Sequence, residues 1–150
     1  MPRGPVRDAW VRTRWKRGPA ADSRGELLVS FTAFVPDTLR DVPGIYRAAE
    51  RLRAQACAEL DGAVGLTTYW QPLRRRVGSL SAWTDEAALR RFIALPYHRE
   101  IMRRYRTRGY VLDARWQADA IDLAAAFRQG VRMLDAAGAV RGHADPAVGA

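Results

Sequence analysis

The sequence predicts an α+β fold of the ferredoxin-like type, in which split βαβ units form an antiparallel sheet with helices on one face. Segments with strand-like alternation and segments with a three- to four-residue apolar repeat succeed one another as strand, helix, strand, strand, helix, strand, helix. The two middle strands are joined by a short turn that contains Pro72 and three arginines, which predicts a hairpin. Helices separate the outer pairs of strands, as this fold requires.

The first strand, residues 26–36, has two faces of different character. One face is wholly apolar, which suits packing against helices, and consists of Leu27, Val29, Phe31 and Ala33. The other face mixes hydroxyl and apolar side chains and consists of Leu28, Ser30, Thr32 and Phe34. Such a mixture is typical of a pocket lining, so Thr32 and Phe34 are candidate ligand-binding residues.

The next elements are a helix over residues 41–62 and the two strands of the hairpin. Pro43 suits the first turn of the helix, and Gly62 lies just past its end. Strands follow over residues 63–73 and 74–85, and Trp83 closes the second strand. Thr84 is the expected N-cap of the following helix.

That following helix is interrupted at Pro96, because proline cannot continue the hydrogen-bonding pattern of a helix interior. We expect a second helical segment over residues 97–108 that Gly109 ends. A fourth strand over residues 110–119 and a last helix over residues 121–138 complete the domain, which spans residues 26–138. Residues 1–25 are predicted to be a basic, partly disordered arm that docks through Trp10 and Trp15 or stays solvated. Residues 139–150, with a solvated His143, are predicted to be a flexible tail.

The formal charge of +9 is a weak indication of a nucleic-acid partner. Of the 25 basic residues Lys16 is the only lysine, and this arginine bias alongside many Ala, Gly and Val residues is typical of a GC-rich coding sequence. We therefore do not expect nucleic acid as a partner. The sequence has no run of membrane-spanning length and no apolar signal-like N-terminus, so we expect a cytoplasmic protein. The single Cys57 and two histidines show no spacing of a metal site.

The second face of the sheet would be open in a monomer of this fold. An apolar patch is predicted there, with contributions from Leu28, Phe34, Trp70 and Trp83. Because pairing two sheets face to face would cover it, we expect a homodimer.

His98 shares one helix face with Ile101, Met102 and Tyr105, which are three, four and seven residues further along. Three interpretations follow: a histidine bonded to backbone carbonyls at the break, a general acid or base, or an axial haem ligand. Asp113 alternates with Arg115 on the last strand, where the two could form a surface pair or line the cleft. The arginines of residues 90–108 are predicted to form a solvated face or a surface for an acidic partner.

The segment "VGSLSAWTDEAALRRFIALPYHREIMRRY", residues 77–105, resembles the dimeric α+β barrel superfamily. Within that superfamily it is similar to the antibiotic-biosynthesis monooxygenase family and to the spheroidene monooxygenase-like family. The first family implies oxidation of aromatic polyketides without metal or flavin, and the second implies haem. By this resemblance Trp83 matches an aromatic that faces the substrate cavity, and His98 matches a histidine after a helix break. Ser79 stands where several relatives place an amide side chain.

We therefore predict a small oxygenase-type enzyme of secondary metabolism that acts on an aromatic or polyene-like metabolite between sheet and helices. His98 and Trp83 are the candidate catalytic residues, and the cofactor is either none or haem held by His98. The candidate substrate-binding residues are Ser79, Ser81, Thr32, Phe34, Trp70, Tyr105 and Trp116. The tryptophans are read either as packing or as an aromatic wall for a flat ligand. The alternatives are a haem-binding protein, a cyclase or isomerase, and a non-catalytic ligand-binding module.

Overall fold

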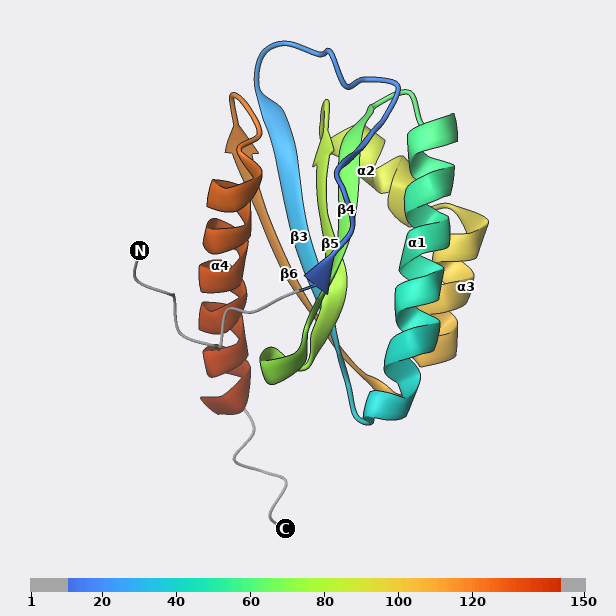
Figure 1. The fold of residues 1–150 in the computed structure, drawn as a ribbon, viewed down its shortest axis with the longest axis vertical. Helices are drawn as coiled ribbons and strands as arrows, with labels where there is room; N and C mark the ends of the chain where they lie inside the picture. Colours follow the sequence, from blue (N-terminus) through green and yellow to red (C-terminus); the bar gives the residue numbers. More distant parts are fainter. Residues whose placement is uncertain (1–10, 144–150) are drawn as a thin grey trace.

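The computed structural model describes residues 11–143 and confirms the predicted ferredoxin-like α+β fold (Figure 1). Its main elements are β3 (Leu27–Pro36), α1 (Val42–Glu59), β4 (Ala63–Gln71), β5 (Arg76–Trp83), α2 (Glu86–Ile93), α3 (Pro96–Tyr105), β6 (Gly109–Ala118) and α4 (Leu123–His143). Trp10 and the last seven residues of the expected tail lie outside the described residues, whereas α4 continues through His143.

The sheet has the strand order β1-β4-β5-β3-β6, and all of its pairs are antiparallel. Strand β3 lies between β5 and β6 and pairs with both along most of its length. In the segment expected to be an arm, β1 (Val11–Arg12) and β2 (Lys16–Arg17) pair with the outer edge of β4. Trp15 lies directly over Gly65, where an added Cβ would come within 2.3 Å of the indole. The glycine therefore provides the space in which this tryptophan docks.

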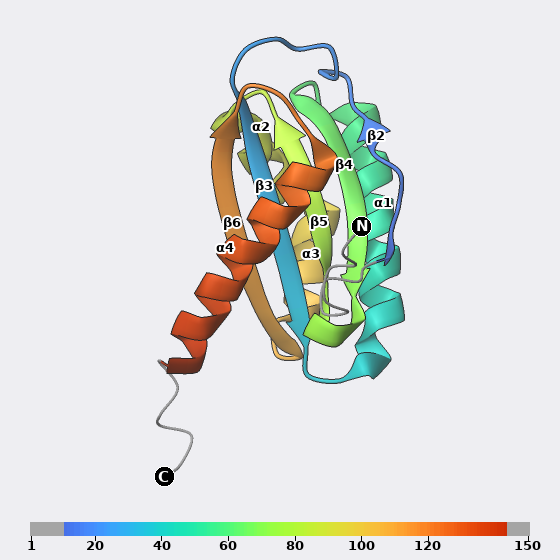
Figure 2. The same cartoon turned by 60° about the vertical axis from the view of Figure 1, so that its left-hand side comes forward.

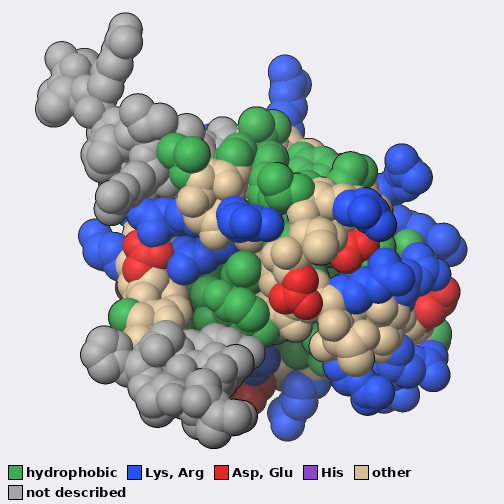
Figure 3. Space-filling view, turned by 90° about the horizontal axis from the view of Figure 1, so that it is seen from below, with side chains coloured by type: hydrophobic (Ala, Val, Ile, Leu, Met, Phe, Trp, Pro, Cys, Tyr) green, Lys and Arg blue, Asp and Glu red, His purple; other side chains and the backbone are tan. Residues whose placement is uncertain are grey.

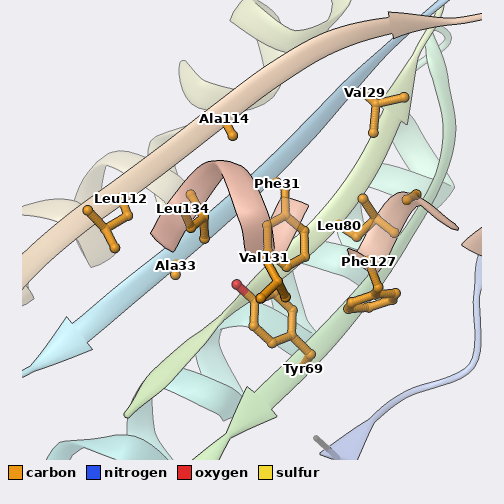
Figure 4. Packing of buried hydrophobic residues seen from close by; sticks show 11 residues of the cluster. Val29, Phe31, Ala33, Tyr69, Leu80, Leu112, Ala114, Phe127, Val131 and Leu134 are labelled. Atoms are coloured by element: carbon orange, nitrogen blue, oxygen red, sulfur yellow. The ribbon is translucent and has the colours of Figure 1, made fainter. Parts of the chain in front are cut away.

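Helices cover both faces of the sheet, as Figures 1 and 2 show from two sides. The helices α1, α2 and α3 pack on one face, as predicted, and the additional helix α4 crosses the opposite face. The apolar side of β3 faces α4, where Val29, Phe31 and Ala33 pack against Phe127 and Leu134 (Figure 4).

The prediction of an open apolar face that contains Leu28, Phe34, Trp70 and Trp83 is wrong. Leu28 and Trp83 pack in one cluster with residues of α1 and α2. Phe34 and Trp70 contact a second cluster formed with Tyr105 of α3. Alternation correctly groups residues by face but does not say which helices cover each face. With α4 on the opposite face, the open-face argument for a homodimer no longer applies.

The packing of α4 rests on a group of three aromatic rings. Phe31 and Tyr69 stack with their centroids 4.8 Å apart, and Phe127 of α4 meets both rings edge-on. Gly130, one turn further along α4, has no side chain to separate the helix from Phe31. An added Cβ there would lie 2.4 Å from the Phe31 ring, whose side chain is fully buried.

The break between α2 and α3 follows the prediction, and the cap of α2 differs from it. Pro96 begins α3 and follows Leu95, whose extended backbone turns the chain. Asp85, and not Thr84, is the N-cap of α2, because its carboxylate accepts a hydrogen bond of 2.8 Å from the Ala88 backbone N–H. None of the helices within residues 11–143 is both long and apolar enough to cross a membrane.

We predict that Gly130→Ala lowers the free energy of unfolding by about 1–3 kcal/mol, because the added methyl group overpacks α4 against Phe31. Gly138→Ala is the matched control in the same helix, since its Cβ would meet its nearest atom at an ordinary 3.5 Å. It should raise the stability by roughly 0.5–1 kcal/mol through helix propensity. Urea unfolding of both variants measures this, and equal behaviour of the two would contradict the close packing of α4 on the sheet.

Candidate functional site

A cavity of about 500 Å³ lies between the sheet and the three helices α1, α2 and α3. Its floor is formed by β3, β5 and β6, and its walls are mainly apolar side chains of the helices, including Leu52, Leu89 and Phe92. A volume of this size suits a ligand of several fused rings.

Four hydroxyl groups form the centre of the cavity floor. Strand register places Ser30 opposite Ser81 and Thr32 opposite Ser79, so that the four side chains share one face of two neighbouring strands. The Thr32 and Ser79 hydroxyl oxygens are 3.3 Å apart, and Ser81 donates to the Ser30 carbonyl at 3.4 Å. The predicted ligand-binding residues Thr32, Ser79 and Ser81 therefore lie together on the cavity lining.

Trp83 lies beside this floor, on the same face of the sheet, and does not line the cavity. Its side chain is fully buried and packs against Phe92, with ring centroids 5.0 Å apart. Its indole N–H donates a hydrogen bond of 2.9 Å to the Ser81 hydroxyl. The tryptophan thus orients a lining residue, and the expected aromatic wall at this position is absent from the described structure.

The other two tryptophans predicted to bind the ligand, Trp70 and Trp116, also lie outside the cavity lining. Trp116 pairs with Val29 in the strand register and packs on the α4 side of the sheet. Trp70 contacts the cluster of Ile45, Val77 and Tyr105, on the cavity side but away from the lining.

Phe34 and Tyr105, both predicted from the sequence, do line the cavity. Their rings meet at an angle, with centroids 6.1 Å apart. Tyr105 is buried, and its hydroxyl would lie 2.7 Å from a Cβ placed on Gly44 of α1. The glycine lets the tyrosine ring reach beneath α1, so this end of the cavity is closed by aromatic packing.

His98 lies in the first turn of α3 and lines the cavity. Its ring meets the Phe92 ring edge-on at 5.0 Å. Its Nδ1 atom is buried and has no hydrogen-bond partner among residues 11–143, so the expected bond to a carbonyl at the break is not formed by this nitrogen. Burial lowers the pKa of His98 below the usual value for histidine. The imidazole is therefore neutral at neutral pH and can accept a proton.

The mouth of the cavity opens between α3 and the edge strand β6. Three arginines line it, Arg103, Arg106 and Arg115. For the first two the sequence predicts a solvated face or a surface for an acidic partner. Asp113 pairs with Arg115 at 3.3 Å, so this pair also lines the cleft. The sequence signal for this placement is the spacing from two cavity residues, since Arg103 follows His98 by five residues and Arg106 directly follows Tyr105.

The described residues offer no alternative metal or thiol site. They contain no group of three or more His, Cys, Asp or Glu residues that could hold a metal ion. Cys57 is buried against the body, where its thiol donates to the Lys16 carbonyl at 3.4 Å and burial raises its pKa. It is therefore a packed thiol and not a reactive one.

Comparison with known proteins identifies the fold. No protein-family model matches the chain, and no curated protein matches it in sequence. A Bacteroides thetaiotaomicron protein described as a possible oxidoreductase matches with a TM-score of 0.52 and 11% identity, over 64% of this chain and 100% of that chain. Rv0793 from Mycobacterium tuberculosis matches with a TM-score of 0.51 and 12% identity, over 66% and 98%.

A third solved structure, from Fusobacterium nucleatum and with a proposed monooxygenase activity, matches with a TM-score of 0.51 and 7% identity. The match covers 67% of this chain and 45% of that one. At these identities the comparisons show the fold and nothing of the reaction.

The depressed pKa of His98 predicts a pH dependence of stability with a definite sign. As the pH falls from about 7.5 to about 5, the unfolded chain takes up the proton on this histidine before the folded chain does, so the free energy of unfolding decreases. His98→Gln lacks this contribution, whereas every other group titrates in both proteins. Urea unfolding across this pH range should show the wild type losing stability relative to the variant. Parallel pH profiles would contradict a buried, neutral His98.

Proposed function

We propose that the protein is a small oxygenase-type enzyme that oxidises a flat aromatic or polyene-like metabolite in the cavity. The observation that carries this proposal is His98, a neutral imidazole that lines an apolar cavity and whose Nδ1 has no hydrogen-bond partner among residues 11–143. Such a group suits removal of a proton from a bound carbon acid. The names of two proteins with this fold, a possible oxidoreductase and a proposed monooxygenase, support the same class of reaction.

The reaction that we propose uses molecular oxygen as its co-reactant. His98 accepts a proton from an activated CH₂ group of the substrate, and the carbanion passes one electron to oxygen. The resulting radicals combine and take up a proton to give a hydroperoxide, which loses water. The net change is CH₂ + O₂ to C=O + H₂O, in which the carbon is oxidised and oxygen is reduced.

The hydroxyl groups of the floor have a defined part in this proposal. Charge that leaves the carbon acid gathers on a conjugated oxygen of the substrate, which then accepts hydrogen bonds more strongly. Ser79 and Thr32 lie on the floor with hydroxyls that bond only weakly to each other, at 3.3 Å. They are available to donate to that oxygen. Trp83 donates a hydrogen bond to the neighbouring Ser81 hydroxyl.

We predict that His98→Gln lowers the rate of oxygen consumption with the anthrone dithranol by about 100-fold or more, because proton removal loses its acceptor. An oxygen electrode, corrected for spontaneous oxidation, measures the rate. Arg99→Gln is the control, since Arg99 is an exposed neighbour that does not line the cavity. Unchanged turnover in His98→Gln would exclude His98 from the mechanism. Conversion of the substrate without oxygen would instead identify a cyclase or isomerase.

A haem-binding protein is the second candidate, and the same histidine favours it. A histidine in the lining of an apolar cavity with arginines at its mouth fits an axial ligand and the haem propionates. Haem, when bound, would supply oxygen or peroxide chemistry. We expect for this candidate a Soret band at equimolar haem that His98→Ala shifts or weakens. No Soret band after reconstitution would exclude it.

The expected homodimer, cytoplasmic location and role in secondary metabolism remain predictions.

A further inference from the structure

The mouth of the cavity carries positive charge that the protein leaves uncompensated. Its three arginines, Arg103, Arg106 and Arg115, are called the mouth arginines here, and Asp113 is the only acidic residue of the described chain that lines the cavity with them. Three guanidinium groups against one carboxylate leave two positive charges at the opening.

Two neighbouring arginines that do not line the cavity have acidic partners. Arg104, on the outer side of α3, pairs with Glu100 at 3.0 Å, and Arg108 pairs with Asp41 at the same distance. Arg103 and Arg106, by contrast, have no ion-pair or hydrogen-bond partner within residues 11–143. Arg115 contacts Asp113 through Nε. Arg99 on the same helix also has no ion-pair partner among the described residues but does not line the cavity, so Arg103 and Arg106 differ from it by their place in the lining.

Apolar side chains lie beside these arginines at the opening. Met102 of α3 and Val111 of β6 both line the cavity, with 46% and 44% of their surfaces exposed. Figure 3, a view from below, shows Lys and Arg side chains gathered on the side of α1 and α3, next to apolar surface. An opening that is both apolar and cationic matches a molecule that is itself divided into an apolar body and an anionic end.

We infer that the cavity takes a flat apolar molecule that carries a carboxylate, with the ring system inside and the carboxylate held by the mouth arginines. This inference rests on the proposed function and names its class of substrate. Guanidinium groups bind carboxylates through two parallel hydrogen bonds, which fix orientation as well as position. A carboxylate anchored at Arg103 and Arg106 would direct the opposite end of the molecule toward His98 and the hydroxyl floor.

Fluorescence titration with anthracenecarboxylate and with the neutral anthracenemethanol of the same ring position tests the inference. The wild type should bind the carboxylate roughly tenfold more tightly than the alcohol. Arg103→Gln and Arg106→Gln should each weaken carboxylate binding about three- to tenfold and leave alcohol binding unchanged. Arg99→Gln, an exposed position on the same helix, should change neither. Equal affinity for the two probes, or arginine variants that weaken both alike, would overturn the inference.

Two further variants locate the binding. Ala49→Phe fills the cavity from α1, and Met102→Trp narrows its mouth from an exposed position that cannot disturb the core. Both should abolish binding of both probes, and binding that survives in the folded Met102→Trp protein would overturn the inference. The titration needs neither oxygen nor an intact His98. Equal affinity for the two anthracene probes, together with intact dithranol oxidation, would therefore refute this inference alone. A clear preference for the carboxylate probe, together with no dithranol oxidation, would refute the proposed function alone.

Haem propionates offer the same carboxylate chemistry, and a separate measurement distinguishes them. Haem bound through the mouth arginines would give a Soret band that Arg103→Gln and Arg106→Gln weaken. If the haem-free protein binds anthracenecarboxylate more tightly than anthracenemethanol, the result supports a small-molecule carboxylate as the ligand. If the mouth arginines strengthen haem binding but the haem-free protein binds anthracenecarboxylate and anthracenemethanol equally well, a small-molecule carboxylate as the substrate is refuted.

Discussion

The register between β3 and its two neighbours is the constraint on which the rest of this structure depends. Side chains of a strand alternate between two faces, so pairing β3 with β5 and β6 assigns every residue of the strand to one of two environments. Phe31 enters the core beneath α4, and the adjacent Thr32 enters the cavity floor. A slip of one residue would exchange them, placing a hydroxyl in the core and a phenyl ring in the floor. Core and cavity are thus the two sides of one strand.

Much of the fold follows from the sequence because its signals are local. Apolar periodicity and turn residues locate β3, the hairpin, the break at Pro96 and the last helix within a few residues. The two short strands before residue 18 could not be found, since two-residue pairings carry no periodic signal. The position of α4 could not be predicted either, because its apolar stripe indicates that the helix is buried but does not say which of the two faces of the sheet it covers. That choice is made by long-range packing, here by Phe127 against Phe31 and Tyr69.

The candidate site was predictable in part, for similar reasons. His98, Tyr105 and the hydroxyls of β3 and β5 follow from the helical stripe and from strand alternation. Trp116 was misplaced because its face depends on its register with Val29, which local sequence does not contain. Arg103 was missed because an arginine at a cavity mouth and one on a solvated face have the same sequence signature. Only the three-dimensional structure distinguishes them, by placing Arg103 in the cavity lining and Arg99 of the same helix outside it.

The helix α3 contributes a single buried residue, Tyr105, to the interior of the protein. Its remaining positions form the wall and opening of the cavity or face solvent, while the fold is held by the sheet and by α1 and α4. The size and charge of the opening are therefore set largely by an element that contributes little to the core. Mutations can accumulate along α3, altering the size and charge of the opening, at little cost to folding. A lineage carrying this fold can in this way change the molecule that it accepts before it changes anything that keeps the chain folded.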